Sequence, residues 1–183
     1  MRVISGASSH LPEGLFLKLA NYRYRVFVER LGWQLPIHDG LETDQFDCPQ
    51  AIYVVAEEPG GEICGCARLL PTSGPYPLTA MFPELLNGTP PPRDPTIWEL
   101  SRFTAVNLAR RSTTPLADFR NSSAALLMRE AMACAASHGA RRLVTVTALA
   151  MERLIRRLGI HSHRMGPPRI VNGELIYGCW IDL

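Results

Sequence analysis

The first third of the chain carries two kinds of apolar pattern, one helical and one strand-like. Residues 14–32 follow Pro12 and Glu13, place apolar residues on two adjacent stripes with helical spacing, and end near Gly32. Residues 51–58 and 63–70 are two apolar runs joined by a Pro-Gly-Gly-Glu turn. We therefore predict a helix followed by a β-hairpin.

The rest of the chain alternates between strand-like and helical patterns. A short helix at most is expected in 78–86, and the longer elements predicted after it are a strand over 96–106, a helix over 122–138, a strand over 141–148 and a helix over 149–159. Asn121 or Ser122 would cap the long helix, and Gly139 would close it. Asn172 and Gly173 lie between two β-like runs and predict a closing hairpin. This order predicts one α/β domain over 1–183, an α-β-α sandwich around a mixed central sheet.

Composition excludes several classes of protein. The 183 residues are 46% hydrophobic and 20% charged, as in ordinary soluble domains, and a net charge of +2 is too small to indicate nucleic-acid binding. No apolar run is long enough for a membrane span, and the N-terminus lacks a signal-peptide pattern. Five scattered cysteines favour reduced thiols in a cytoplasmic protein over a disulfide framework.

The positive charge of this chain has an unusual source, because Lys18 is its single lysine and arginine supplies the rest. Arg23 and Arg68 fall inside apolar runs of the predicted helix and hairpin. Arginine pairs in a bidentate manner with carboxylates, and one buried among apolar residues needs an anion. Both arginines therefore predict acidic partners elsewhere in the chain.

Two segments supply these partners. Three carboxylates crowd one short turn-rich stretch at Glu42, Asp44 and Asp47, and a strand that should be apolar contains Glu99 and Arg102. A charged pair inside a strand is costly to desolvate, so it is seldom there for stability. An ion pair on an edge strand is one interpretation of Glu99 and Arg102.

The other interpretation is a functional cleft beside the strand. Strict alternation would place Glu99 on the face of Ser101 and Phe103, with Arg102 on the opposite face. A β-bulge near Ser101 would bring both charges toward one cleft, and bulges are frequent beside active sites.

Together these residues predict a network of arginines and carboxylates around a cavity. Its members would be Arg23, Arg68, Arg102, Glu42, Asp44, Asp47 and Glu99. Such a cavity suits a ligand that carries both a carboxylate and an amine. Four aromatic residues adjoin the charges in sequence, and their faces suit a cation or a flat base: Phe27, Trp33, Phe46 and Phe103.

Other chemistries fit the residues less well. The acidic stretch lacks the central glycine and distal glutamate of a calcium loop, and His161 and His163 have no nearby acid or cysteine to complete a metal site. We expect no metal. The chain also lacks a nucleophile elbow, a Walker loop and a dinucleotide-binding glycine turn.

Four stretches resemble, in order, the N-acyl-homoserine-lactone synthases, the autoinducer synthases of bacterial quorum sensing. They are RYRVFVERLGW at 23–33, ETDQFD at 42–47, CARLLPT at 66–72 and WELSRF at 98–103. The resemblance implies a fold related to the N-acetyltransferases, with S-adenosylmethionine and an acyl-carrier protein as substrates and no cofactor. The amine of S-adenosylmethionine would take the acyl group, and its carboxylate would then displace methylthioadenosine (MTA) to close the lactone.

The resemblance also implies roles for single residues. Glu99 would be the general base, Asp44 would face the amine or sulfonium, and Glu42 and Asp47 would hold the arginines. The catalytic set is then Glu99, Arg102 and Asp44, and the set that binds S-adenosylmethionine is Arg23, Phe27, Trp33, Glu42, Asp44, Asp47, Arg68, Arg102, Phe103 and Thr104. Candidates for the acyl-chain pocket are Phe82, Ser101, Thr145, Thr147, Leu149 and Met151.

Acyl-carrier proteins are acidic, so a basic surface should receive one. The candidates are Arg110, Arg111, Arg153, Arg156 and Arg157, with Arg141 and Arg142 as further contributors. Two rival hypotheses remain at this stage. An acetyl-coenzyme-A-dependent N-acetyltransferase should have a glycine-containing pyrophosphate loop after the central strand, which this chain lacks, and a non-catalytic ligand-binding domain should have lost some of the charged residues, which are all present. The sequence does not decide the length of the acyl chain, nor whether the acyl donor is a carrier protein or coenzyme A.

Overall fold

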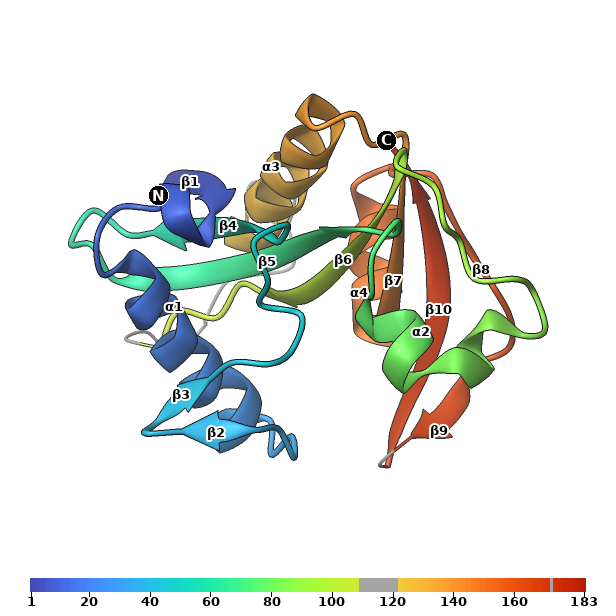
Figure 1. The fold of residues 1–183 in the computed structure, drawn as a ribbon, viewed down its shortest axis with the longest axis horizontal. Helices are drawn as coiled ribbons and strands as arrows, with labels where there is room; N and C mark the ends of the chain where they lie inside the picture. Colours follow the sequence, from blue (N-terminus) through green and yellow to red (C-terminus); the bar gives the residue numbers. More distant parts are fainter. Residues whose placement is uncertain (109–121, 172) are drawn as a thin grey trace. The chain divides into compact units, whose positions relative to one another are not determined.

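In the computed structural model, residues 1–108, 122–171 and 173–183 are described, and Figure 1 shows their ribbon. The chain forms two compact units. The first comprises Met1–Arg68 with Arg102–Glu130, and the second comprises Leu69–Ser101 with Ala131–Leu183. Arg110 and Arg111, expected to dock a carrier protein, lie outside the described residues.

The first unit contains a helical segment and the part of the sheet that runs from β1 to the end of β6. Its elements are β1 (Arg2–Ala7), η1 (Ser8–His10), α1 (Leu15–Arg23), η2 (Tyr24–Arg30), β2 (Ile37–His38), β3 (Leu41–Glu42), β4 (Ile52–Glu57), most of β5 (Ile63–Pro71), the end of β6 (Ile97–Thr104) and the start of α3 (Ser123–Ser137). The strands follow the order β1-β4-β5-β6, and β2 pairs with β3 separately. Helix α1 lies beside β3, as Figure 1 shows.

The helix predicted over 14–32 is present but changes type along its length. It runs as an α-helix to Arg23 and continues as a π-helix to Arg30, between Gly14 and Gly32, which both have positive φ. One predicted apolar stripe is buried throughout: Leu15, Leu19, Tyr22 and Val26 are at most 4% exposed. A π-helical turn is rare and frequent at functional sites, and this one begins directly after Arg23.

Strand β1 was not predicted from the sequence. It pairs antiparallel with β4, from Arg2 opposite Glu57 to Ala7 opposite Ile52. Its side chains are mostly half-buried or exposed, and Gly6 and two serines interrupt or follow the apolar residues. The strand is stabilised by main-chain pairing, which leaves little hydrophobic signal in the sequence.

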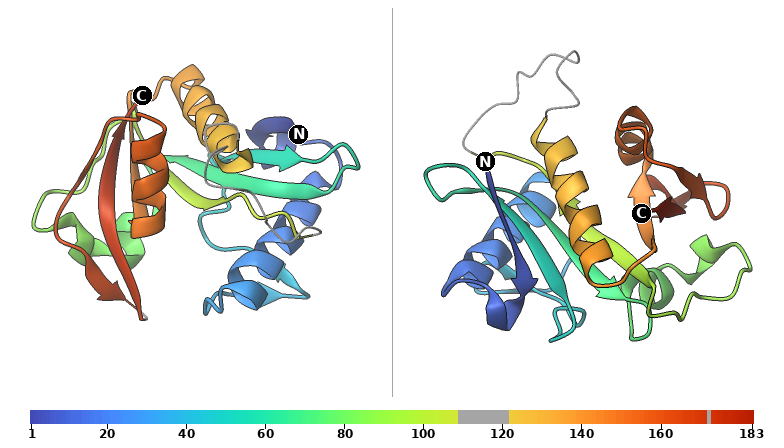
Figure 2. Two further views of the ribbon diagram at one scale, coloured as in Figure 1. Left: turned by 180° about the vertical axis from the view of Figure 1, so that it is seen from behind. Right: turned by 90° about the horizontal axis from the view of Figure 1, so that it is seen from above.

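The second unit contains the mixed part of the sheet. Its elements are the end of β5, α2 (Pro77–Met81), η3 (Pro83–Leu86), the start of β6, the end of α3, β7 (Arg142–Ala148), α4 (Leu149–Arg157), β8 (Ser162–Arg164), β9 (Arg169–Val171) and β10 (Glu174–Asp182). Strand β6 runs parallel to β7, whereas β10 is antiparallel to β7, β8 and β9. Figure 2 shows α4 lying along β7.

Several predicted element boundaries have clear local causes. Ser122 Oγ accepts a hydrogen bond from the Ala125 N–H at the start of α3, and Gly139 closes this helix with a φ of 88°. Gly173, with a φ of 83°, lies in the predicted turn between β9 and β10.

The predicted α/β class and mixed sheet are confirmed, because helices alternate with strands and the sheet contains both parallel and antiparallel pairs. In the described part of the chain, no helix is both long enough and apolar enough to cross a bilayer.

Candidate active site

Arg23 is the first cation of the site and lies on the buried side of α1. Its side chain is 1% exposed. Its Nε donates to Glu42 Oε2, and its two terminal nitrogens donate to Asp47 Oδ1 and Oδ2 at 2.8 and 3.0 Å. Two carboxylates therefore supply the anion that the burial of Arg23 was predicted to require.

Arg68 extends from β5 and is completely buried. Its Nη1 and Nη2 donate to Oδ1 and Oδ2 of Asp44, a bidentate pair, and Nη1 also donates to Asp47 Oδ1 at 2.9 Å. Such fork-to-fork pairs are among the stronger hydrogen bonds in proteins because both partners are charged. Asp47 thus links Arg68 to Arg23.

Arg102, near the end of β6, closes the arrangement. Its Nη2 donates to Glu42 Oε1 at 2.9 Å and to Asp44 Oδ2 at 2.8 Å. Each arginine therefore binds two acids and each acid binds two arginines. We call this closed, alternating set the ionic ring; its members, in order, are Arg23, Glu42, Arg102, Asp44, Arg68 and Asp47.

The ionic ring is buried and electrically balanced, with three cations and three carboxylates. Arg102 is its most accessible member, with 9% of its side chain exposed. Burial alone would raise the pKa of Asp47, but hydrogen bonds and charge from Arg23 and Arg68 hold it well below its usual range. Burial likewise opposes the charge of Arg23, yet Asp47 and Glu42 raise its pKa.

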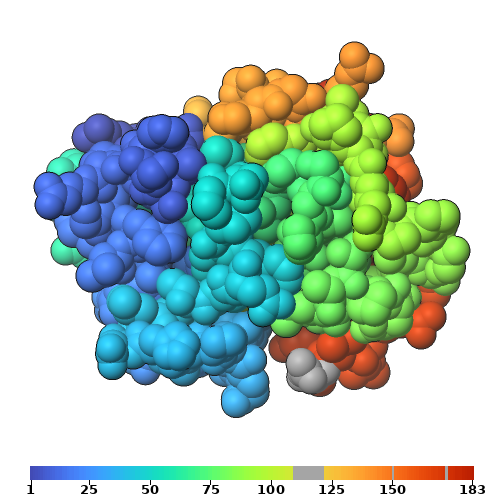
Figure 3. All heavy atoms as spheres, viewed as in Figure 1, coloured from blue at the N-terminus to red at the C-terminus, as the bar shows by residue number. Residues whose placement is uncertain are grey.

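A tight turn explains why three carboxylates are neighbours in sequence. The Asp44 N–H donates to Asp47 Oδ2 at 2.8 Å, the Phe46 N–H donates to Asp44 Oδ1 at 2.9 Å, and the Asp47 N–H donates to the Asp44 carbonyl. The acids therefore bind the backbone of their own turn as well as the arginines. In Figure 3 the blue and cyan residues around this part of the first unit form a closely packed surface.

Two features of the ionic ring were not predicted. Tyr53 on β4 donates its hydroxyl to Asp47 Oδ1 at 2.9 Å, and a tyrosine within an apolar strand gave no sign of this role. Both carboxylate oxygens of Asp44 bind arginines. The structure therefore places Asp44 with Arg68 and Arg102, in the holding role that the sequence analysis assigned to Glu42 and Asp47.

Aromatic rings border the ionic ring. Phe27 and Trp33 are stacked, with centroids 4.8 Å apart and planes inclined by 21°. The Arg102 guanidinium lies over Phe27, and that of Arg68 lies over Phe46, each 5.7 Å from the ring centroid. Phe27 is buried whereas Trp33 is 40% exposed, so this stack leads from the ring to solvent.

The backbone at Arg102 is unusual. Its φ is +51° within strand β6, a left-handed conformation that costs a non-glycine residue about 1–2 kcal/mol. The β-bulge expected near Ser101 stays a prediction, and the structure shows a left-handed backbone at the next residue, Arg102. Phe103 is half-buried and Thr104 is buried, on the short remainder of the strand. Strain of this kind in an ordered strand points to a functional site.

Glu99 belongs to the second unit and is 1% exposed on β6, opposite Val144 of β7. Its Oε1 accepts a hydrogen bond from the Leu78 N–H at 2.8 Å, in the first turn of α2. Tyr76, just before this helix, has a pKa raised to about 12 by its burial and by the charge of Glu99. Glu99 is thus a buried carboxylate held by the main chain of α2, and its role as a general base stays a prediction.

The candidates for the acyl-chain pocket are all in the second unit. Thr145 and Thr147 are buried on one face of β7. The others, Phe82, Ser101, Leu149 and Met151, are half-buried. Their role as a pocket stays a prediction.

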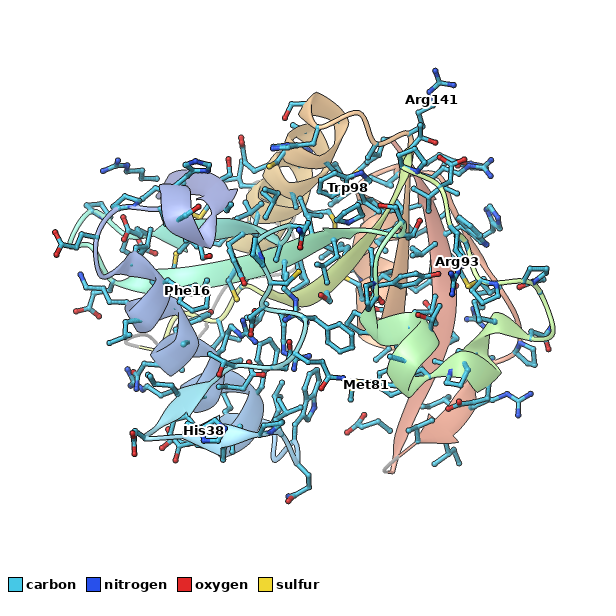
Figure 4. The ribbon with its side chains drawn as sticks, viewed as in Figure 1. Phe16, His38, Met81, Arg93, Trp98 and Arg141 are labelled. Carbon is cyan, nitrogen blue, oxygen red and sulfur yellow. The ribbon has the colours of Figure 1, made fainter. Side chains whose placement is uncertain are left out.

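The candidates for carrier-protein docking that the structure describes lie at the surface. Arg153, Arg156 and Arg157 are exposed on α4, and Arg156 is 3.7 Å from Glu152. Arg141 projects into solvent at the start of β7, as Figure 4 shows. Arg142 donates its Nε to Asp182 Oδ1 and lies over Trp180.

Among the described residues, no three or more histidine, cysteine, aspartate or glutamate side chains come together in a group that could hold a metal ion. His161 instead binds Asp182 through Nδ1. None of the five cysteines forms a disulfide bond.

Comparison with known proteins identifies the family. The autoinducer synthase family matches residues 11–183 of this chain. An acyl-homoserine-lactone synthase of Ralstonia solanacearum is 48% identical over all of this chain and 89% of that protein. One from Acinetobacter nosocomialis is 44% identical over the whole of both proteins.

Solved structures extend the comparison to the fold. TofI in a ternary complex with an inhibitor and MTA is 44% identical, with a TM-score of 0.85 over 100% of this chain and 91% of that chain. BjaI, a coenzyme-A-dependent acyl-homoserine lactone synthase solved with SAM and isopentyl-CoA, is 26% identical, with a TM-score of 0.82 over 98% and 81%. A putative N-acetyltransferase from Lactobacillus plantarum, 18% identical over 100% and 98%, shares the fold at a TM-score of 0.62.

The relation to the N-acetyltransferase fold that the four motifs implied is therefore confirmed. A match over nearly the whole chain, and relatives above 40% identity along its full length, leave one conclusion: this chain belongs to the autoinducer synthase family.

Proposed function

We propose that this protein acylates the amine of S-adenosylmethionine from an acyl-carrier-protein thioester and then lactonises the product, giving an N-acyl-L-homoserine lactone and MTA. The observation that carries the proposal is the intact ionic ring in a chain of this family. A non-catalytic relative would have been free to lose such costly buried charges. We propose that residues 1–183 act as one synthase domain, in the cytoplasm, where both substrates are made.

The first step is binding of S-adenosylmethionine. This substrate carries a carboxylate, an ammonium and a sulfonium, so it offers an anion and two cations to a ring that contains both signs. Arg102, the most accessible cation, would bind the carboxylate, and Asp44 beside it would attract the ammonium or sulfonium. The stack of Phe27 and Trp33 offers an aromatic face to the sulfonium or the adenine, with Phe103 and Thr104 as neighbours.

The second step is acyl transfer. Glu99 removes a proton from the ammonium, directly or through one water, and the free amine attacks the thioester carbonyl. Backbone N–H groups of 101–104, the segment in which the Arg102 backbone is left-handed, would stabilise the oxyanion. Collapse of the tetrahedral intermediate breaks the C–S bond and releases the thiol of the carrier. The acyl chain would lie in the pocket proposed above.

The third step is lactone closure within one molecule. A carboxylate oxygen of the substrate attacks its own γ-carbon, the bond from this carbon to sulfur breaks, and neutral MTA leaves with the electron pair. A sulfonium is a good leaving group, so the step mainly needs the carboxylate to be held in position. Both bond exchanges are polar, and we propose that no cofactor takes part.

The acyl donor could be a carrier protein or coenzyme A, since the related synthase BjaI is described as coenzyme-A-dependent. We favour a carrier protein for this chain. Three arginines are exposed together on α4, and Arg141 is exposed at the start of β7. Such a basic surface suits an acidic protein partner. The sequence after β6 also lacks the glycine-containing pyrophosphate loop of coenzyme-A-binding acetyltransferases.

The test is to incubate the purified chain with S-adenosylmethionine and, in parallel, with acyl-carrier proteins and acyl-coenzyme A of matched chain lengths. We expect acyl-homoserine lactone and MTA by mass spectrometry, with the carrier-bound donors giving the higher kcat/KM. Absence of both products with every donor would overturn the proposed function. A preference for acyl-coenzyme A would overturn only the choice of donor.

Glu99→Gln tests the general base. The amide oxygen of glutamine still accepts the Leu78 N–H, so the fold should persist, while the turnover number should fall about 10²–10⁴-fold. The measurement is kcat against pH, with circular dichroism as the check on folding. An unchanged kcat and pH profile would show that another group takes the proton.

A further inference from the structure

The segment that follows Arg102 is held by contacts that the ionic ring does not explain. Arg102 is one of three non-glycine residues with positive φ in the described part of the chain, and the other two, Asp39 and Asn87, lie outside the helices and strands. A left-handed arginine inside a strand does not persist unless its surroundings impose it. Two side-chain groups, one from β5 and one from α1, constrain this segment.

The first group is the thiol of Cys66 on β5. Its Sγ donates to the main-chain carbonyl of Arg102 at 3.3 Å, and the residue is buried. Burial raises the pKa of this thiol to about 12, so it remains protonated and able to donate at neutral pH. The bond fixes the peptide group that directly follows the left-handed residue.

The second group is the hydroxyl of Tyr22 on α1. It donates to the Val106 carbonyl at 2.8 Å and accepts from the Val106 N–H at 3.2 Å. Both main-chain groups of Val106 are thus bound by one buried side chain, four residues beyond Arg102. Tyr22 also directly precedes Arg23, so α1 supplies one member of the ionic ring and one anchor for the segment that carries another.

A third observation shows how closely β5 approaches this segment. A Cβ atom added at Gly65 would lie 3.0 Å from the Thr104 carbonyl oxygen and 3.0 Å from Leu127 Cδ2. Real Cβ atoms are rarely found so near a backbone atom, so glycine is what lets β5 come this close to the end of β6. Residues 102–106 are therefore held by contacts from β5 and α1 of the first unit.

We propose that Cys66 and Tyr22 are positioning residues for Arg102: they hold residues 102–106 in the form that places the Arg102 guanidinium between Glu42 and Asp44. The proposal rests on the proposed function, in which Arg102 binds the carboxylate of S-adenosylmethionine. Cys66 binds the main-chain carbonyl of Arg102 and Tyr22 binds the main chain of Val106, so each side chain acts through the backbone rather than through the Arg102 guanidinium.

The chain offers a matched control for Cys66. Cys64 lies two residues earlier on the same strand, is equally buried, and donates its thiol to the Ala56 carbonyl rather than to β6. We compare Cys66→Ala, Cys66→Ser and Cys64→Ala by steady-state kinetics with S-adenosylmethionine as the varied substrate and by thermal unfolding. The serine variant keeps a donor at position 66.

We expect Cys66→Ala to raise KM for S-adenosylmethionine about three- to tenfold, the effect of one lost hydrogen bond on substrate positioning, with a smaller change in kcat. Cys66→Ser should restore most of the wild-type KM, and Cys64→Ala should leave KM unchanged even where its Tm falls as far. Equal KM values for the two alanine variants, or no rescue by serine, would overturn the role of Cys66.

Tyr22→Phe gives an independent arm because it removes both hydrogen bonds to Val106 and keeps the aromatic ring. It should raise the same KM, and the double variant with Cys66→Ala should show less than the product of the two single effects, since both act on one segment. An unchanged KM in Tyr22→Phe would overturn its role. Failure of the proposed function is distinguishable, because the wild-type protein would then form no lactone.

Discussion

The ion pairs described in the two units differ in their exposure to water. In the first unit, the six members of the ionic ring have at most 9% of their side chains exposed. In the second unit, Asp182 binds Arg142 and His161, and Glu152 binds Arg164, with exposed fractions of 19–81%. The ion pairs of the two units therefore differ in burial, and burial rather than the number of pairs should decide how much each contributes to stability.

The physical difference is desolvation. Exposed ion pairs contribute about 0–1 kcal/mol because water and salt compete with the partner. In a buried set the attraction is stronger, yet it is offset by the cost of removing the charges from water, so the set as a whole is weak evidence for stability. What burial does produce is interdependence, because loss of one member leaves others charged and unsatisfied. We therefore expect the surface pairs to be replaceable one at a time, whereas loss of any member of the ionic ring should leave its partners buried and unsatisfied.

The largest effect should come from Arg23→Met. This change leaves Glu42 and Asp47 buried without their main cation, so the free energy of unfolding should fall by about 3–5 kcal/mol. Chemical denaturation monitored by circular dichroism measures it. Arg142→Met, an exposed arginine with one acidic partner, is the matched control and should change the free energy by less than about 1 kcal/mol. Similar losses in the two variants would contradict the comparison.

A smaller effect should come from Asp47→Asn, together with a change in acid stability. The pKa of Asp47 is lower in the folded protein than its ordinary value of 3.8, so its contribution to stability is fully present above about pH 4 and is lost as the pH falls through the folded-state pKa. We expect the asparagine variant to lose about 1–3 kcal/mol at pH 7. Its stability should also fall less steeply than that of the wild type below pH 4.

Unfolding free energies measured from pH 7 down to pH 2 test this prediction. Asp182→Asn is the control, since its carboxyl has a lowered pKa too but is bound at the surface by His161 and Arg142. Parallel acid-stability curves for wild type and Asp47→Asn would show that Asp47 is not the residue responsible.

The smallest effect should come from Glu152→Gln on the surface of the second unit. It removes a carboxylate that binds Arg164, and we expect a loss of at most about 1 kcal/mol that vanishes in 1 M salt. Arg23→Met measured in the same two salt concentrations should keep most of its loss, because buried pairs are poorly screened. If Glu152→Gln lowered the free energy of unfolding equally at both salt concentrations, the pair of Glu152 with Arg164 would behave like a buried ion pair.

Much of the fold was predictable because its elements carry local signals. Helix α3 has an N-terminal serine cap and a closing glycine, and the β4–β5 hairpin has an apolar pattern on both sides of its turn. Strand β1 lacked such a signal, since it depends on main-chain pairing with β4. The π-helical turn after Arg23 was not predicted either, because the apolar pattern of 14–32 indicated one continuous helix and gave no local signal for a change of helix type.

The sequence by itself determined that Arg23, Arg68 and Arg102 need anions, and this conclusion rests on residue type and local pattern. The four motifs, including the acidic turn, indicated an autoinducer synthase through their resemblance to that family. Tertiary structure alone decided which acid binds which arginine, that Asp44 shares in holding them, and that Tyr53 joins Asp47. The reason is physical: Arg102 and Glu42 are 60 positions apart, and only the packing of β6 near the acidic turn brings their charges within hydrogen-bond distance.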